Sequence, residues 1–120
     1  MKIKLGDLVK SKEVLLKLTE KDLPIETSFK LSLIAEKVTP ELNAFEQQRI
    51  KLVKKHGVKD PKGNYTVLDE NIDSFGKDII LLYEQDVEFE KVTGINIEDL
   101  GNEIKMSAKD LILLNWLFEK

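Results

Sequence analysis

One long series of residues, spaced alternately three and four apart, constrains the fold of this chain more than any other feature. The series, called here the first seam, comprises Leu31, Ala35, Val38, Leu42, Phe45, Arg49, Leu52 and His56. An α-helix has 3.6 residues per turn, so residues with this spacing lie on one face. We therefore expect an amphipathic helix over Ile25–His56 that packs lengthwise against a second helix.

The first seam contains a proline, which allows two interpretations. Thr39-Pro40-Glu41 has the pattern of a helix start, with threonine at the N-cap and proline at the first helical position. The segment is therefore either two helices that meet near Thr39 or one kinked helix. The seam stays in phase across Pro40 and favours the kink. At the far end, Gly57 is predicted to be a left-handed cap, and His56 to interact with the last carbonyls of the helix.

A second series with the same spacing predicts the partner of this helix. Called the second seam, it comprises Ile72, Phe75, Ile79, Leu82, Asp86 and Phe89, with Asn71 or Asp73 as the cap. Turn-forming residues 60–64 and a β-favouring run at 65–68 lie between the two seams. These patterns predict an antiparallel helical hairpin, joined by a short β-hairpin or loop, in which residues 42–52 pack against 75–82.

The two ends of the chain predict small additional elements around this hairpin. Residues 2–5 alternate like a strand with Ile3 and Leu5 facing inward, and residues 8–19 have helical spacing with Asp7 as N-cap. Residues 87–90 and 95–97 alternate with period two and could form a strand pair that takes up the N-terminal strand. The predicted fold class is mainly α with minor β (α+β), in a single domain over 1–120.

The C-terminal run is the most apolar part of the sequence. Ser107 and Asp110 have the spacing of a helix-capping box, and within 111–118 only Asn115 is not apolar. A helix over 107–119 would be hydrophobic nearly all round. Either the rest of the domain covers it completely, or part of it contacts a protein partner or a second copy. The candidate partner-binding residues are Leu113, Trp116, Leu117 and Phe118.

Arg49 is the only arginine among the 19 Lys and Arg residues, and it lies on the first seam. A planar guanidinium is preferred over an ammonium where a carboxylate is held at a partly dry interface. One interpretation is therefore a structural ion pair with Asp86 or Glu84 on the facing helix, which would fix the register. The other is an arginine whose stem packs on the seam while its head stays in water.

Residue types that commonly catalyse reactions or bind metal ions are scarce in this sequence. The chain has no cysteine and one histidine, and it contains neither a phosphate-binding nor a metal-binding loop motif. Carboxylates at Glu88, Glu90, Glu98 and Asp99 leave a carboxylate-based enzyme as a minor alternative to solvated surface charge. We therefore expect no catalytic, cofactor-binding or metal-binding residues and no cofactor.

Charge and hydropathy limit the expected partners and location. Net charge is −3 with lysines and acids interspersed, so nucleic acid is not the expected partner, although Lys51, Lys54 and Lys55 leave that as a weaker alternative. The sequence has neither a secretory signal nor an apolar run long enough to span a membrane, so no membrane association is expected. Together with the absence of cysteine, this favours a cytoplasmic location.

The order of the sequence features resembles that of a known family. E-L-N-A-F-E-Q-Q-R-I-K-L-V-K-K-H-G is followed by D-P-K-G-N-Y, a predicted helix, a short acidic strand and M-S-A-K-D-L-I-L-L-N-W-L-F-E. This resembles an uncharacterised family of small proteins from phages and prophages of Gram-positive bacteria. The layout is also similar to the helical hairpins of prefoldin-type subunits, but the predicted helices are shorter, so no chaperone role follows.

The scarcity of catalytic residue types predicts a non-enzymatic protein-binding module, and the resemblance implies a phage-encoded one that occupies a surface of a host or phage protein. An inhibitor or adaptor directed at a host system, anti-defence included, is one such role. A virion-assembly or tail-associated component is the alternative, which would place the protein in the virion. The expected partner is a protein, and a homo-oligomer is possible.

Overall fold

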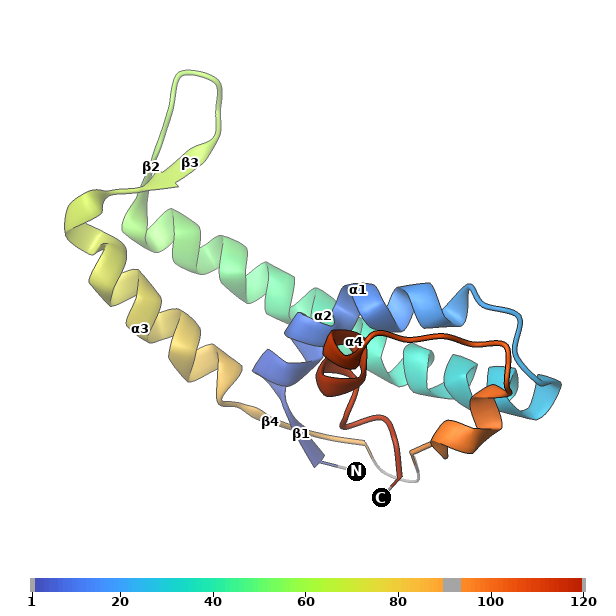
Figure 1. Ribbon diagram of the computed structural model, residues 1–120. Helices are drawn as coiled ribbons and strands as arrows, with labels where there is room; N and C mark the ends of the chain where they lie inside the picture. The colour runs from blue at the N-terminus through green and yellow to red at the C-terminus, as the bar shows by residue number, and fades with distance from the viewer. Residues whose placement is uncertain (1, 90–93, 120) are drawn as a thin grey trace.

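The computed structural model describes residues 2–89 and 94–119, and it confirms a mainly helical fold with minor β-structure. In chain order the elements are β1 Lys2–Lys4, α1 Leu5–Thr19, α2 Ile25–His56, β2 Gly57–Lys59, β3 Tyr65–Val67, the 3-10 turn η1 Asp69–Asn71, α3 Ile72–Tyr83, β4 Asp86–Glu88, the 3-10 turn η2 Ile97–Leu100 and α4 Ala108–Leu113. The molecule is elongated, with extents of 50 × 28 × 24 Å. Its long axis follows α2 (Figure 1).

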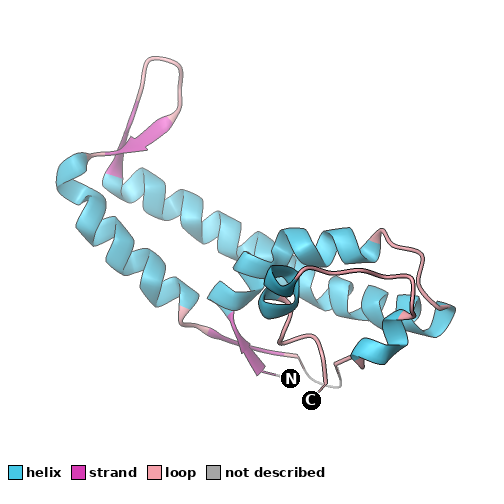
Figure 2. Cartoon of the chain, in the orientation of Figure 1, coloured by secondary structure: helices cyan, strands magenta, loops and turns pink. Residues whose placement is uncertain are grey.

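Two regions share α2, and we call them the body and the arm. The arm is residues 45–83: the second half of α2, the β2–β3 hairpin, η1 and α3. The body is the rest of the described chain, in which α1, the first half of α2, β1, β4 and the C-terminal segment pack together. The arm projects from the body as two helices side by side with the hairpin at its far end (Figures 1 and 2).

Helix α2 is continuous through Pro40, so the alternative of two helices is wrong. Pro40 lies on an exposed side of α2, where the carbonyl that it leaves without an amide donor can bond to water. On the residue before the proline, the Thr39 hydroxyl donates to the Ala35 carbonyl, about one turn earlier, at 2.9 Å. The unbroken phase of the first seam thus predicted the continuity of the helix correctly.

The two arm helices pack as predicted. The rings of Phe45 and Tyr83 stack with centroids 5.7 Å apart at the base of the arm, and His56 meets Phe75 edge-on at 6.0 Å near its far end. These pairs join the start of one helix segment to the end of the other, so α2 and α3 are antiparallel neighbours (Figure 1).

The β2–β3 hairpin forms where turn chemistry predicted it, but Gly57 has a different role. Its φ of −116° is extended, so it is not the left-handed cap that the sequence suggested. A Cβ at this position would lie 2.6 Å from the Val53 carbonyl oxygen and 2.7 Å from that of Thr66. Glycine is needed here because two backbone segments approach closely. In the turn, the Asp60 carboxylate accepts amide hydrogen bonds from Lys62 and Asn64, both at 2.9 Å.

The second seam overestimated the length of α3. The helix ends at Tyr83, and Asp86–Glu88 forms β4, which pairs antiparallel with β1 so that Ile3 lies opposite Val87. Period two therefore determines the structure after Glu84, and the N-terminal strand is taken up as expected. The predicted partner strand at 95–97 is absent from the described residues; Ile95 instead forms an isolated parallel bridge to Phe118. The 87–90 pattern extends into Glu90, which lies outside the described residues.

At the N-terminus, the predicted helix begins earlier than its pattern indicated. Helix α1 starts at Leu5, Lys4 occupies the N-cap position, and Asp7 lies inside the first turn rather than at the cap. An acidic side chain there still interacts favourably with the positive end of the helix dipole. Ile3 and Leu5 are both buried, as the alternation predicted.

The predicted C-terminal helix is much shorter than 107–119. The Ser107 hydroxyl caps it by accepting the Asp110 amide at 3.1 Å, as expected, but α4 ends at Leu113 and turns follow. The Leu117 carbonyl accepts from the Ile95 amide, and the Ile95 carbonyl accepts from the Glu119 amide, both at 2.9 Å. Local turn hydrogen bonds, such as that from the Leu117 amide to the Leu114 carbonyl at 2.8 Å, therefore follow α4, and pairing with the distant Ile95 begins at Leu117.

Candidate protein-binding surface

The C-terminal residues predicted to bind a partner mostly pack against the rest of the body. Leu117 has no exposed surface, so its assignment as a contact residue is wrong. Leu113, Trp116 and Phe118 are partly buried and pack against the core. The Trp116 indole N–H donates to the hydroxyl of Ser11 on α1 at 3.0 Å, and Ser11 is completely buried. Most of this segment therefore follows the first interpretation, in which the rest of the domain covers it.

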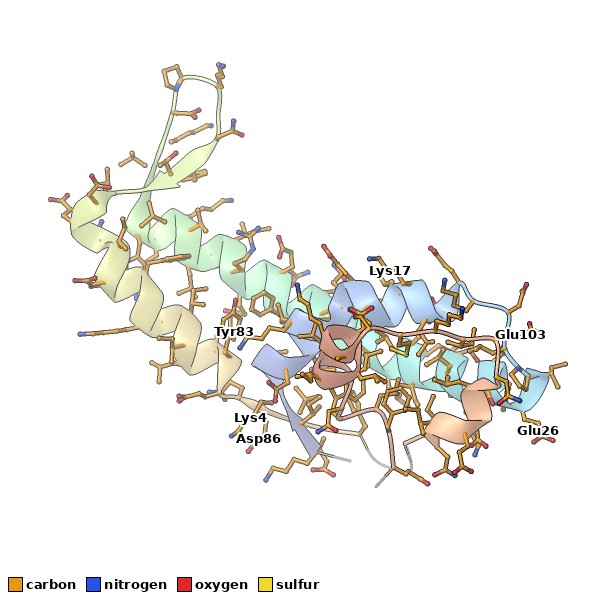
Figure 3. All side chains as sticks on the ribbon, in the orientation of Figure 1. Lys4, Lys17, Glu26, Tyr83, Asp86 and Glu103 are labelled. Atoms are coloured by element: carbon orange, nitrogen blue, oxygen red, sulfur yellow. The ribbon has the colours of Figure 1, made fainter. Side chains whose placement is uncertain are left out.

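Arg49 does not pair across the arm. Its guanidinium Nε donates to Glu46 Oε2 at 2.9 Å, and its Nη2 bonds the other carboxylate oxygen, so both partners lie on α2. Asp86 instead contacts Lys4 at 3.0 Å and Lys2 at 3.5 Å on the neighbouring strand (Figure 3). The Glu84 backbone carbonyl accepts from Lys4 Nζ at 3.2 Å. The predicted ion pair is therefore wrong, because the chain leaves the helix after Tyr83 and carries Asp86 to β1.

The polar link between the arm helices is made by His56, which the sequence analysis assigned to capping. His56 is 9% exposed, and its Nε2 lies 2.8 Å from Asp78 Oδ2 on α3. The hydrogen bond from His56, with a weaker contribution from Lys55 Nζ at 3.4 Å, lowers the pKa of the Asp78 carboxyl. The His56 ring thus fixes the register of the arm, while its backbone carbonyl accepts the side-chain amide of Asn71 at 3.0 Å.

The other shifted carboxyl groups are also held in their charged form. The hydrogen bond from Arg49 lowers the pKa of Glu46, and that from Lys4 lowers the pKa of Asp86. A general acid needs the opposite shift, towards a raised pKa. These groups therefore act as ion-pair partners on the surface.

The carboxylates considered for an acid/base site lie on different elements. Glu88 is in β4 with its Cα opposite Lys2, whereas Glu98 and Asp99 are in η2. Glu90 lies outside the described residues. Among the described residues, no group of three His, Asp or Glu side chains is placed to hold a metal ion.

An exposed apolar stripe on the first half of α2 was missed by the sequence analysis. Ile25, Phe29 and Leu33 follow each other four residues apart and are 85%, 64% and 44% exposed. At 100° per residue they lie on the side of α2 opposite the buried residues of the same segment, which are Thr27, Leu31, Ile34 and Val38. The I-x-x-x-F-x-x-x-L spacing is present in the sequence, but α2 carries apolar residues on two faces here, and spacing alone does not show which face is covered.

An acidic hollow of about 520 Å³ adjoins this stripe between the start of α2 and η2. It is lined by Pro24, Ile25, Glu26, Thr27, Lys30, Glu98, Asp99 and Gly101, three carboxylates against one ammonium. The Thr27 hydroxyl donates to the Asp99 carbonyl at 2.7 Å and holds η2 against α2. Glu26 marks this site at the end of the molecule farthest from the β2–β3 hairpin (Figure 3).

No family model matches the chain, and neither the curated proteins nor the solved structures compared with it give a match. In the described ranges 2–89 and 94–119, no helix is both long and apolar enough to cross a bilayer.

Proposed function

We propose that this chain is a non-enzymatic protein-binding module that occupies a surface of another protein. The stripe of Ile25, Phe29 and Leu33 carries the proposal, because three large apolar side chains follow one outward face of a helix. Burying such a side chain fully stabilises a complex by about 1.5–3 kcal/mol relative to leaving it in water. Phe29, at the centre of the stripe, is the expected anchor.

The charge beside the stripe specifies the chemistry of the partner. Three carboxylates around the hollow next to Ile25 favour a partner with an apolar groove rimmed by lysine or arginine. Charges at such a rim mainly raise the association rate, so the rate should fall as the salt concentration increases. The stripe should contribute most of the affinity and the hollow most of the orientation.

The resemblance to small phage proteins supplies the setting of this proposal. We place the protein in the cytoplasm of a Gram-positive host during phage infection or prophage expression. An inhibitor or adaptor would bind a host protein stoichiometrically. The alternative, an assembly or tail-associated component, would bind phage structural proteins and appear in purified particles.

Affinity capture from infected cells, followed by mass spectrometry, tests the proposal when wild type is compared with Phe29→Ser. Ile50→Ser is the matched control, because Ile50 is another exposed apolar residue of α2, 41% exposed, in the arm. The captured protein should be lost with Phe29→Ser and retained with Ile50→Ser. Calorimetric titration of that purified protein should then show about tenfold or greater weakening by Phe29→Ser, as for anchor residues. Equal binding by wild type and Phe29→Ser would overturn the proposal.

A further inference from the structure

Helix α3 has a second apolar face that the arm does not cover. Ile72, Gly76 and Ile80 lie four residues apart on one side of the helix, and the two isoleucines are 51% and 56% exposed. The side that meets α2 is different, because it carries Asp78 against His56. Although α3 is strongly apolar, none of its residues is buried.

No contact with the described residues explains Gly76, at the centre of this face. A Cβ built there would meet none of their atoms within 4 Å, so no described neighbouring segment requires a glycine. Glycine is the least favourable residue in a helix interior apart from proline. A glycine on an exposed helix face allows the backbone of another helix to approach closely.

We propose that two copies of this chain associate through this face, with α3 crossing α3 of the second copy in antiparallel orientation at Gly76. The residues are symmetric about that point, since Ile72 lies four positions before Gly76 and Ile80 four positions after it. A two-fold axis at Gly76 therefore brings Ile72 of each copy onto Ile80 of the other. The four isoleucines cover one another and Gly76 permits close packing.

The charges beside this face are complementary in the same arrangement. Asp73 and Lys77 lie on one edge of the face, three positions before and one position after Gly76. In an antiparallel pair, Asp73 of one copy is offset from Lys77 of the other by two residues, or about 3 Å along the helix axis. Two symmetric ion pairs therefore lie along that edge of the isoleucine cluster. In a parallel arrangement, this edge of one helix would lie on the opposite side of the interface from the same edge of the other, so Asp73 and Lys77 would form no pair across it.

The association does not depend on the proposed function, because α3 lies in the arm and the α2 stripe lies at the opposite end of the molecule (Figure 1). A dimer would carry two α2 stripes and would bind a multivalent partner with greater avidity. One helix crossing is a small interface, so the dimer should dissociate in the micromolar range.

Sedimentation equilibrium over a concentration series spanning the micromolar range tests the proposal. Wild type should shift from monomer to dimer, and Ile80→Lys should stay monomeric. The matched control is Leu81→Lys, because Leu81 is the next residue, 59% exposed, and points to another side of α3. It should dimerise like wild type. Circular dichroism checks that all three remain helical. A monomeric wild type, or equal loss of dimer in both variants, would overturn the proposal.

Charge reversal tests the antiparallel register. Asp73→Lys should weaken the dimer several-fold by placing two lysines together, and the double variant Asp73→Lys/Lys77→Asp should restore it. Failure of the double variant to recover, while it remains helical, would contradict this register. Gly76→Ala gives an independent measurement. It should raise the melting temperature of dilute monomer but weaken dimerisation, whereas an unchanged dimer affinity would remove the role assigned to Gly76.

Discussion

The body and the arm use the same kinds of helices but cover their apolar faces very differently. All buried apolar side chains among the described residues belong to the body, apart from Phe45 where the arm begins. In the arm, the exposed apolar residues are Ile50, Val58, Tyr65, Ile72, Ile80 and Leu81. The apolar stripe of an amphipathic helix is at least about 100° wide, and one neighbouring helix covers only part of it. A third layer gives the body a core, even though the α2 stripe of Ile25, Phe29 and Leu33 stays exposed on its outside, whereas the arm, with no third layer, forms no core of its own.

This comparison also separates what stabilises the two regions. The body relies on burial, with Leu8, Ile95, Leu114 and Leu117 all fully buried. The arm relies on a few specific contacts between α2 and α3, the stacked Phe45–Tyr83 pair and the His56–Asp78 hydrogen bond among them. Local opening should therefore occur in the arm at a lower free energy than in the body.

The largest expected effect comes from Phe45→Ala, which removes the side chain that joins the arm to the body. Phe45 is 6% exposed, so its truncation should lower the free energy of unfolding by about 3–5 kcal/mol. Phe29→Ala is the matched control on the same helix, at 64% exposure, and should change it by less than about 0.5 kcal/mol. Chemical denaturation of both variants measures the difference. Equal effects would contradict the assignment of one phenylalanine to the interior and the other to a surface.

A somewhat smaller effect tests whether the C-terminal segment belongs to the body. Leu117→Ala should lower the free energy of unfolding by about 2–5 kcal/mol because Leu117 is fully buried. Ile112→Ala, at a position 75% exposed, should have an effect below about 0.5 kcal/mol. Thermal melts followed by circular dichroism provide the measurement. A mild Leu117→Ala phenotype would show that this segment does not complete the core.

The pH dependence of the arm is expected to be weaker than either truncation. Hydrogen bonding to His56 lowers the pKa of the Asp78 carboxyl below its unfolded value of about 3.9. The folded state therefore binds this proton less readily than the unfolded state does. The contribution of Asp78 is present above pH about 4 and is lost as the pH falls through the folded pKa.

Hydrogen exchange of the α3 amides in wild type and Asp78→Asn measures this contribution. The protection gained from the aspartate should shrink as the solution is acidified below pH about 4. Asp60→Asn in the hairpin turn serves as a control for removing one carboxylate from the arm. If the difference in protection between wild type and Asp78→Asn stayed constant through this acid range, the stabilising role of the His56–Asp78 hydrogen bond would be contradicted.

The smallest effect is expected from Glu46→Gln, which removes the partner of Arg49. Both side chains are substantially exposed, at 51% and 42%, and they lie one turn apart on α2. Such pairs stabilise helices by about 0.2–0.5 kcal/mol, and less at high salt. Urea denaturation at low and high ionic strength checks this value. A loss above about 1 kcal/mol would restore to Arg49 the cross-arm role that the structure does not give it.

Much of this fold follows from local spacing in the sequence. Two seams of alternating three- and four-residue steps predicted α2, the position of α3 and their antiparallel packing. Turn residues predicted the β2–β3 hairpin, and Ser107 predicted a cap. The unbroken phase across Pro40 predicted a single helix. Each of these features depends on residues within a few turns of one another, where covalent geometry fixes which side chains share a face.

Tertiary structure alone decided where the periodic patterns stop and which residues meet across the fold. Residues after Glu84 fit both a helix and a strand, and the presence of β1 selected the strand, which carried Asp86 away from Arg49. The C-terminal segment likewise leaves the helix after Leu113, and its backbone around Leu117 pairs with Ile95. The exposed α2 stripe became recognisable only when its opposite face was seen to be covered. Local spacing assigns residues to faces, but hydrogen bonds and burial with distant segments decide which faces are occupied.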